Sequence, residues 1–187
     1  MLKRALIIAA IFVVVIVIFF NWFKKDTKKH SPSATAEYAE GPLKIKIDYC
    51  RPSAKGRIIF GDKATEALQP YGEYWRLGAN EATVFETNSP IFFNDKKLDA
   101  GKYSLYAYPG EKVWTICVNS DWDRWGAQEA DKSKDVLRTE IEAINDAPIK
   151  EQFEITLTPI DSNNTVALNF HWDKTSVTVL LKNALGE

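Results

Sequence analysis

The chain has few of the residues that metal centres and nucleophilic active sites require. Among its 187 residues there are two cysteines and two histidines, and because His30 lies in the expected linker they cannot build a four-ligand zinc site of the usual kind. The GxSxG nucleophile elbow and the GxxxxGK[ST] phosphate loop are both absent. His171 lies between Phe170 and Trp172, on the opposite face of an alternating segment, which is typical of a surface or packed histidine. We therefore predict no metal, no cofactor and no nucleophilic catalysis.

A surplus of positive charge is also missing from most of the chain. Residues 1–29 hold six basic groups and one acidic group, whereas the whole chain holds 24 and 25. The remainder thus carries 18 basic and 24 acidic residues, a formal charge of −6. Proteins that bind nucleic acid present a basic surface to the phosphates, so we predict no nucleic-acid partner.

One long apolar run does occur. Residues 5–23, from Ala5 to Phe23, contain a single polar residue, Asn21, and as a helix would span about 30 Å, the thickness of a bilayer core. The run ends in bulky aromatic residues followed by lysines, which favours a retained anchor over a cleaved signal peptide. We predict a transmembrane anchor with basic flanks over residues 1–25. Charge alone leaves its orientation open, but an N-terminal anchor before a folded domain favours export of that domain.

The composition changes twice after the anchor. Residues 26–41 are polar, contain Pro32 and show no apolar periodicity, so we expect a linker. From residue 42 the pattern has a period of two, beginning with Leu43, Ile45 and Ile47 alternating with polar residues. We therefore place a single folded domain at residues 42–187.

Short alternating or apolar segments follow one another about every ten residues through this domain, with turn residues between them. Eight or nine short strands without long amphipathic helices indicate an all-β fold, an antiparallel β-sandwich or jelly-roll-like domain. Residues 136–144 suit either a strand or a short helix, and residues 64–68 suit a helical turn.

Three polar segments are candidates for a ligand surface. Residues 71–83, YGEYWRLGANEAT, combine an aromatic stacking face with charged groups between two glycines; alternatively, these side chains bind the loop's own backbone. Residues 51–57, RPSAKGR, place three cations where a carboxylate or phosphate would bind, unless local acids pair with them. Residues 120–126, SDWDRWG, offer tryptophans for sugar stacking, which alternatively cap the core. The candidate ligand-binding residues are Arg51, Arg57, Trp75, Arg76, Asn80, Glu81 and Trp125.

The two cysteines, Cys50 and Cys117, fall at or near the ends of expected strands. In an exported domain they can form a disulfide, and the alternative is two separate half-buried thiols. The residues themselves leave both possibilities open.

Several segments of this chain resemble an uncharacterised family of bacterial secreted or envelope proteins, classed as a domain of unknown function. They are residues 51–61, 71–83, 100–110, 113–119, 124–126 and 135–138, and the most specific is WRxGANxAT. The resemblance covers roughly residues 44–182 and implies an exported, β-rich domain, with no established activity or catalytic residues. Many members of that family carry a cleavable signal and have Ser where this chain has Cys50, which weakens the case for a required disulfide.

These observations lead to one expected function and two alternatives. We expect a membrane-anchored, extracytoplasmic binding or interaction module at the cell envelope, with an unidentified ligand or protein partner. The first alternative is a hydrolase of envelope glycans or peptides, with Glu81 as acid/base and a second carboxylate such as Asp123. The second alternative is a structural envelope protein without a small ligand.

Overall fold

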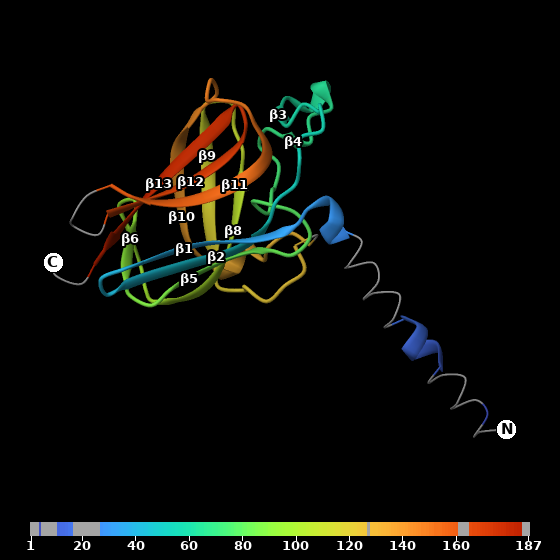
Figure 1. Ribbon diagram of the computed structural model, residues 1–187, viewed down its shortest axis with the longest axis horizontal. Coiled ribbons are helices and arrows are strands. Elements are labelled where there is room, and N and C mark those ends of the chain that lie inside the picture. Colours follow the sequence, from blue (N-terminus) through green and yellow to red (C-terminus); the bar gives the residue numbers. More distant parts are fainter. Residues whose placement is uncertain (1–3, 5–10, 17–26, 127, 161–164, 185–187) are drawn as a thin grey trace.

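The computed structural model describes residues 4, 11–16, 27–126, 128–160 and 165–184, which form thirteen strands and two short 3-10 helices together with two short helical segments at residues 11–16 and 27–30 (Figure 1). The strands and 3-10 helices are β1 (Ser33–Glu40), β2 (Leu43–Cys50), β3 (Phe60–Gly61), η1 (Lys63–Thr65), β4 (Gln69–Pro70), β5 (Thr83–Thr87), β6 (Ile91–Phe93), β7 (Lys96–Leu98), β8 (Gly101–Tyr108), β9 (Val113–Asn119), η2 (Lys132–Lys134), β10 (Asp135–Ile144), β11 (Lys150–Pro159), β12 (Thr165–Asp173) and β13 (Thr175–Asn183). No helix in these ranges is long and apolar enough to cross a membrane. Most of the expected anchor lies outside the described residues.

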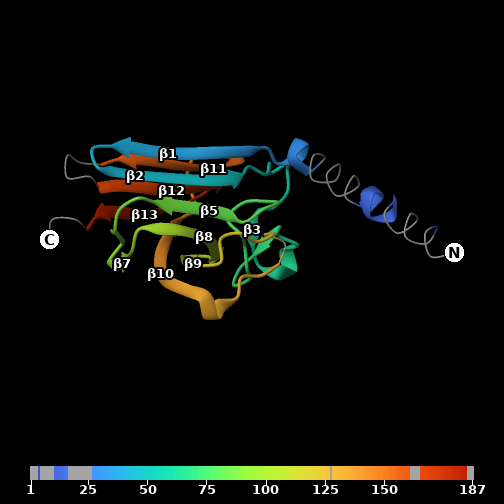
Figure 2. The same ribbon diagram turned by 90° about the horizontal axis from the view of Figure 1, so that it is seen from below.

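The strands confirm an all-β fold with a large antiparallel sheet. Nine strands follow one another across it in the order β1-β2-β5-β8-β9-β10-β13-β12-β11, and the β6-β7 hairpin adds to β13. The long strand β10 pairs with β9 along most of its length and with β13 only at Ala143 and Ile144. It therefore connects two halves of the sheet that run in different directions (Figures 1 and 2).

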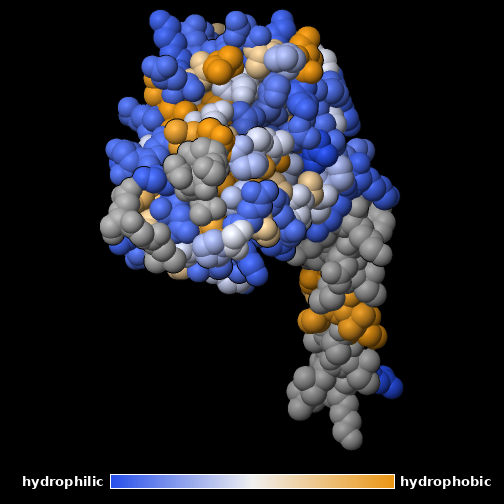
Figure 3. Space-filling view, turned by 60° about the vertical axis from the view of Figure 1, so that its left-hand side comes forward, coloured by the Kyte–Doolittle hydropathy of each residue, from blue (hydrophilic) through white to orange (hydrophobic). Residues whose placement is uncertain are grey.

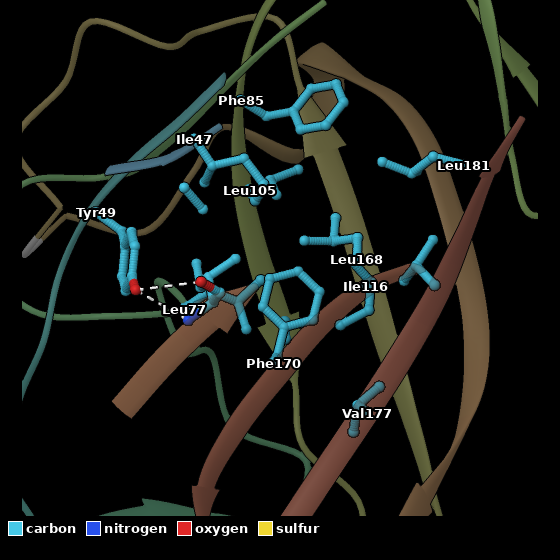
Figure 4. Close-up of a cluster of buried hydrophobic side chains, with 14 of the residues drawn as sticks. Ile47, Tyr49, Leu77, Phe85, Leu105, Ile116, Leu168, Phe170, Val177 and Leu181 are labelled. Atoms are coloured by element: carbon cyan, nitrogen blue, oxygen red, sulfur yellow. Dashed lines mark hydrogen bonds between the residues drawn. The ribbon is translucent and has the colours of Figure 1, made fainter. Parts of the chain in front are cut away.

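The two halves enclose one hydrophobic core. In Figure 4, Ile47 and Leu105 from one half point toward Phe170 from the other, and all three are almost completely buried. A direct link crosses the core where the Tyr49 hydroxyl donates to the carbonyl of Ile155 at 3.3 Å and accepts from its amide at 3.0 Å. Alternation places every second side chain of β2 and β12 in this core, as the period-two pattern predicts.

The linker expected at residues 26–41 is wrong over its second half, because Ser33–Glu40 forms β1. This strand pairs with β2 along its whole length, from Ser33 opposite Cys50 to Glu40 opposite Leu43. The connection is a two-residue turn at Gly41 and Pro42, with Gly41 at φ +59°. The inward residues of β1 are mainly small, so their alternation is weak in the sequence although the strand is in full register.

Three shorter segments can also be compared with the expectations from the sequence. Residues 136–144 form a strand, β10, because Leu137, Thr139 and Ile141 all face inward in register with β9. The short apolar segment at residues 57–60 contributes only Phe60 to a strand, the two-residue β3, which pairs in parallel with β4. The helical turn expected at residues 64–68 is the single turn η1. The count of thirteen strands exceeds the expected eight or nine, because the shortest strands leave no periodic pattern in the sequence.

Aromatic side chains fill one end of the core. The ring of Trp75 stacks on that of Trp172 with centroids 5.8 Å apart, and it meets Phe153 at 5.0 Å and Trp114 at 5.7 Å in edge contacts. Phe60 packs edge-on to Trp75 at 5.5 Å. This end of the core supports the loops that carry most of the candidate ligand-binding residues.

Candidate functional site

Residues 71–83 continue a strand position that β5 leaves vacant. β5 pairs with residues 101–105 of β8 and leaves the end of β8 unpaired on that side. Beyond this point, Trp75 exchanges two backbone hydrogen bonds with Ala107 of β8, at 2.8 and 2.7 Å. The indole nitrogen of Trp75 donates to the carbonyl of Gly78 at 3.1 Å, and only 2% of the residue is exposed. Trp75 is thus held in the core and is not a free stacking surface.

A tight turn follows Trp75 and positions the next polar residues. Leu77 and Asn80 adopt positive φ angles of 50° and 61°, and Gly78 has φ 156°. A Cβ atom at Gly78 would lie 2.9 Å from the carbonyl oxygen of Cys50, so the backbone of β2 approaches too closely for a side chain there. The Thr83 hydroxyl closes the turn by donating to the carbonyl of Leu77 at 2.7 Å.

The loop between β9 and η2 packs directly on this turn. A Cβ atom at Gly126 would lie 2.7 Å from the carbonyl oxygen of Asn80. Next to it, Arg124 donates to the carbonyl of Gln128 at 2.7 Å and to the hydroxyl of Tyr74 at 2.8 Å. The two loops therefore form one continuous surface.

A pocket of about 460 Å³ opens where these loops meet, and we call it the arginine pocket. Its charged and polar lining includes Ser31, Arg57, Tyr74, Arg76, Asn80 and Glu129, and its wall includes the core residues Trp75 and Trp172. Four of the seven predicted ligand-binding residues thus come together in one place, from segments that are separate in the sequence. They are Arg57, Trp75, Arg76 and Asn80.

The two arginines of this pocket are held by backbone carbonyls and not by acids. Arg57 donates to the carbonyl of Ala54 at 3.0 Å and to that of Ser53 at 2.7 Å, and Arg76 donates to the carbonyl of Asn80 at 3.1 Å. Neither takes part in any ion pair between described residues. A guanidinium has five N–H donors, so each arginine retains donors for a further acceptor.

Arg76 is half-buried, and its surroundings disfavour its charge. Loss of hydration lowers the pKa of its guanidinium; the neighbouring Tyr74 opposes this shift, and the positive charge of Arg124 adds to it. An anion bound in the pocket would supply the missing counter-charge. This favours a carboxylate or phosphate as a ligand group, the chemistry that the sequence suggests for residues 51–57.

Arg51 and Glu81 lie outside the arginine pocket. Arg51 pairs with Glu154 at 3.3 Å and donates to the carbonyl of Phe153 at 3.1 Å, so its charge is already neutralised. Glu81 lines a separate pocket of about 320 Å³, where it pairs with Lys28 at 3.1 Å and accepts from the thiol of Cys50 at 3.4 Å.

The environment of Glu81 favours its ionised form. Burial alone would raise the pKa of this carboxyl, but hydrogen bonds from its own backbone amide, from Lys28 and from Cys50 outweigh burial and hold the pKa below its usual value. An acid/base group of a hydrolase works best with a pKa near the operating pH, so this shift is in the unfavourable direction.

The tryptophans of residues 120–126 do not line the arginine pocket. Trp122 is partly exposed, with the Lys102 ammonium 4.1 Å from its ring centroid, and Trp125 is half-buried beside the turn at Gly126. Asp123 is exposed and takes no part in any ion pair between described residues.

The pocket residues that sequence reasoning missed include Ser31, Tyr74, Glu129 and Trp172. Tyr74 lies within residues 71–83, but its residue type indicates ligand binding less strongly than those of its neighbours Trp75 and Arg76. Ser31 and Glu129 lie in polar stretches with no pattern, and Trp172 belongs to a strand whose alternation indicates only burial. Nothing local in the sequence connects these positions, so only the fold brings them together.

The cysteines do not form a disulfide. Cys50 and Cys117 are both free and buried, and they belong to different surroundings. Cys50 contacts Glu81 and Ser33, whereas Cys117 packs with Tyr106 on the outer face of the sheet. Among the described residues, no group of three or more His, Cys, Asp and Glu side chains is arranged to hold a metal ion.

The fold and the pocket define a single all-β domain with a cationic cavity at one end. Residues 31–181 match the family described as "Protein of unknown function (DUF2911)", and the chain belongs to this family. This confirms the expected membership in a domain family of unknown function. A search of curated proteins and a search of solved structures found no match.

Proposed function

We propose that this protein is a membrane-anchored module of the cell envelope that binds a small anionic ligand in the arginine pocket without transforming it. One observation carries the proposal: Arg57 and Arg76 line a single cavity, and neither is paired with an acid among the described residues. An unpaired, half-buried guanidinium such as that of Arg76 is costly unless a ligand compensates its charge.

The described part of the apolar run supports the anchor. Residues 11–16 are helical, and all six are large apolar side chains exposed by 40% to 65% (Figure 3). A helix that is apolar on all sides is typical of a membrane or another apolar environment. We propose that this run anchors the chain and that the β-sandwich-like domain lies outside the cytoplasm.

The segment after the run contacts the ligand-binding end of the domain. Ser31 lines the arginine pocket, and its carbonyl accepts from the side-chain amide of Asn80 at 3.3 Å. Lys28 pairs with Glu81, the next residue along. Under the proposal, these contacts hold the pocket near the point where the chain leaves the membrane.

The hydrolase alternative receives less support. A paired-carboxylate mechanism needs two carboxyl groups across one cavity, and Glu129 is the only one among the described residues that line the arginine pocket. Glu81 lines the neighbouring pocket, and Asp123 lines neither of them.

The test of the pocket uses the full chain in detergent micelles, titrated with acetate and with inorganic phosphate at low ionic strength. Binding is followed by tryptophan fluorescence, because Trp75 and Trp172 belong to the pocket wall. We expect saturable binding that falls at least tenfold in Arg76→Gln, because a charge-assisted hydrogen bond is lost. Glu81→Gln is the matched control from the same loop and should bind like the wild type.

Two results would contradict this proposal. One is that neither anion binds the wild type. The other is that Arg76→Gln binds as well as the wild type while its circular dichroism spectrum and melting temperature are unchanged. The anchor is tested separately by alkaline extraction of membranes from expressing cells, in which an anchored chain stays in the pellet and a peripheral chain is released.

A further inference from the structure

The charged side chains that line the arginine pocket have opposite signs and come from different loops. Arg57 and Arg76 supply two positive groups, and Glu129 supplies the single negative group among the described lining residues. No ion pair joins Glu129 to either arginine, so its carboxylate lies more than 4.0 Å from both guanidinium groups. The cavity therefore separates charges that pair readily when they are free to meet.

The contacts around each group explain why they stay apart. Arg57 is tied to the carbonyls of Ser53 and Ala54, and Arg76 to that of Asn80. Glu129 belongs to the loop between β9 and η2, which packs through Gly126 against the carbonyl of Asn80 and is held by Arg124 through the carbonyl of Gln128. The positive groups and the negative group thus belong to different loops, each held by its own backbone contacts.

Resting on the proposed function, we propose that the ligand is a small molecule carrying both an anionic group and an amine a few ångströms away. The carboxylate or phosphate binds between Arg57 and Arg76, and the ammonium faces Glu129. Such a ligand pairs with charges of both signs at once, whereas a simple anion makes no favourable contact with Glu129. The volume of about 460 Å³ is large enough to admit such a molecule.

Two matched pairs of probes test this inference in the full chain. β-Alanine and propionate share a carboxylate, and phosphoethanolamine and ethyl phosphate share a phosphate; only the first of each pair carries an amine. We expect the amine to tighten binding by about three- to fivefold, the strength of an exposed ion pair. Glu129→Gln should abolish this preference, because the ammonium loses its counter-charge, and Arg76→Gln should weaken binding of all four probes.

The outcomes separate this inference from the proposed function. If both members of each pair bind the wild type equally, the anion pocket stands and the amine inference is wrong. If the preference persists in Glu129→Gln, the amine is recognised elsewhere and the inference is also wrong. If no probe binds, both proposals fail.

The same chemistry occurs in a free molecule and in a phosphatidylethanolamine headgroup. Titration of phosphoethanolamine into the full chain in phosphatidylglycerol vesicles, with and without phosphatidylethanolamine, distinguishes these sources. Binding of the soluble probe weakens in the mixed vesicles if the lipid competes for the pocket. It is unchanged if the ligand is a free molecule, and either result supports the proposed ligand class.

Discussion

Replacement of Gly78 by alanine tests whether the turn after Trp75 is dictated by backbone contact. Gly78 has φ 156°, a conformation that residues with a side chain rarely adopt, and this costs about 1–3 kcal/mol. The new Cβ would lie 2.9 Å from the carbonyl oxygen of Cys50 and 3.2 Å from the hydroxyl oxygen of Thr83. Because the first of these atoms belongs to the backbone of β2, relieving the overlap should cost about a further 1–3 kcal/mol.

Gly72 is the matched control for this substitution. It lies in the same segment with φ +76°, but a Cβ there would meet no atom within 4 Å. Gly72→Ala therefore carries only the conformational cost, about 1–2 kcal/mol. We expect a loss of about 4 kcal/mol for Gly78→Ala and about 1 kcal/mol for Gly72→Ala.

Thermal unfolding of the full chain in detergent, followed by circular dichroism, measures both variants. For a protein of this size, each kcal/mol lowers the melting temperature by about 2–4 °C, so the variants should differ by roughly 6–12 °C. Equal melting temperatures for the two variants would refute the steric argument. They would mean that β2 moves away from the turn at little cost.

The remaining predictions concern pH. Burial raises the pKa of the Cys117 thiol from 9.0 to about 11, so the thiol ionises at a lower pH in the unfolded chain than in the folded one. The wild type should therefore lose stability between pH 9 and 11, at up to about 1.4 kcal/mol per pH unit. Urea unfolding of Cys117→Ala should show a smaller loss over this range, and an identical slope would contradict this reasoning. A hydrogen bond from Lys150, with further help from Arg51, lowers the pKa of Glu154 below 4.5, although burial opposes the shift. The contribution of the ion pair is present above the unfolded-state pKa and is lost as the pH falls through the folded-state pKa. Glu154→Gln should therefore be about 0.5 kcal/mol less stable than the wild type at pH 7, and the two should converge once the pH falls below the folded-state pKa. A constant difference across this range would exclude the ion pair as the cause.

The alternating pattern of residues was enough to predict the fold class. Residues such as Leu43, Ile45 and Ile47 alternate with polar ones because one face of their strand is buried, and this periodicity is a local property. The sequence did not predict β1, because two of its three inward residues, Ala34 and Ala36, are too small to mark a buried face beside Tyr38. Its pairing partner, and not its own sequence, makes it a strand.

The candidate site was likewise predicted only in part from the sequence. The sequence indicated Arg57 and Arg76 through their residue type and their place in glycine-containing loops, and both line the arginine pocket. It also indicated Arg51 and Glu81, which the fold pairs with Glu154 and Lys28 instead. Residue type shows that a side chain is able to bind an anion, but only its neighbours in space decide whether it is already neutralised.

By itself, the sequence determined that this chain has an apolar N-terminal run, a β-rich domain and a segment around Trp75 with unusual composition. Each of these follows from hydropathy, periodicity or residue type along a short stretch. Tertiary structure alone decided that Trp75 belongs to the core, that Ser31 and Glu129 belong to one pocket, and that the cysteines stay apart. The physical reason is that burial, ion pairing and cavity formation depend on contacts between residues far apart in the chain, which no local pattern encodes.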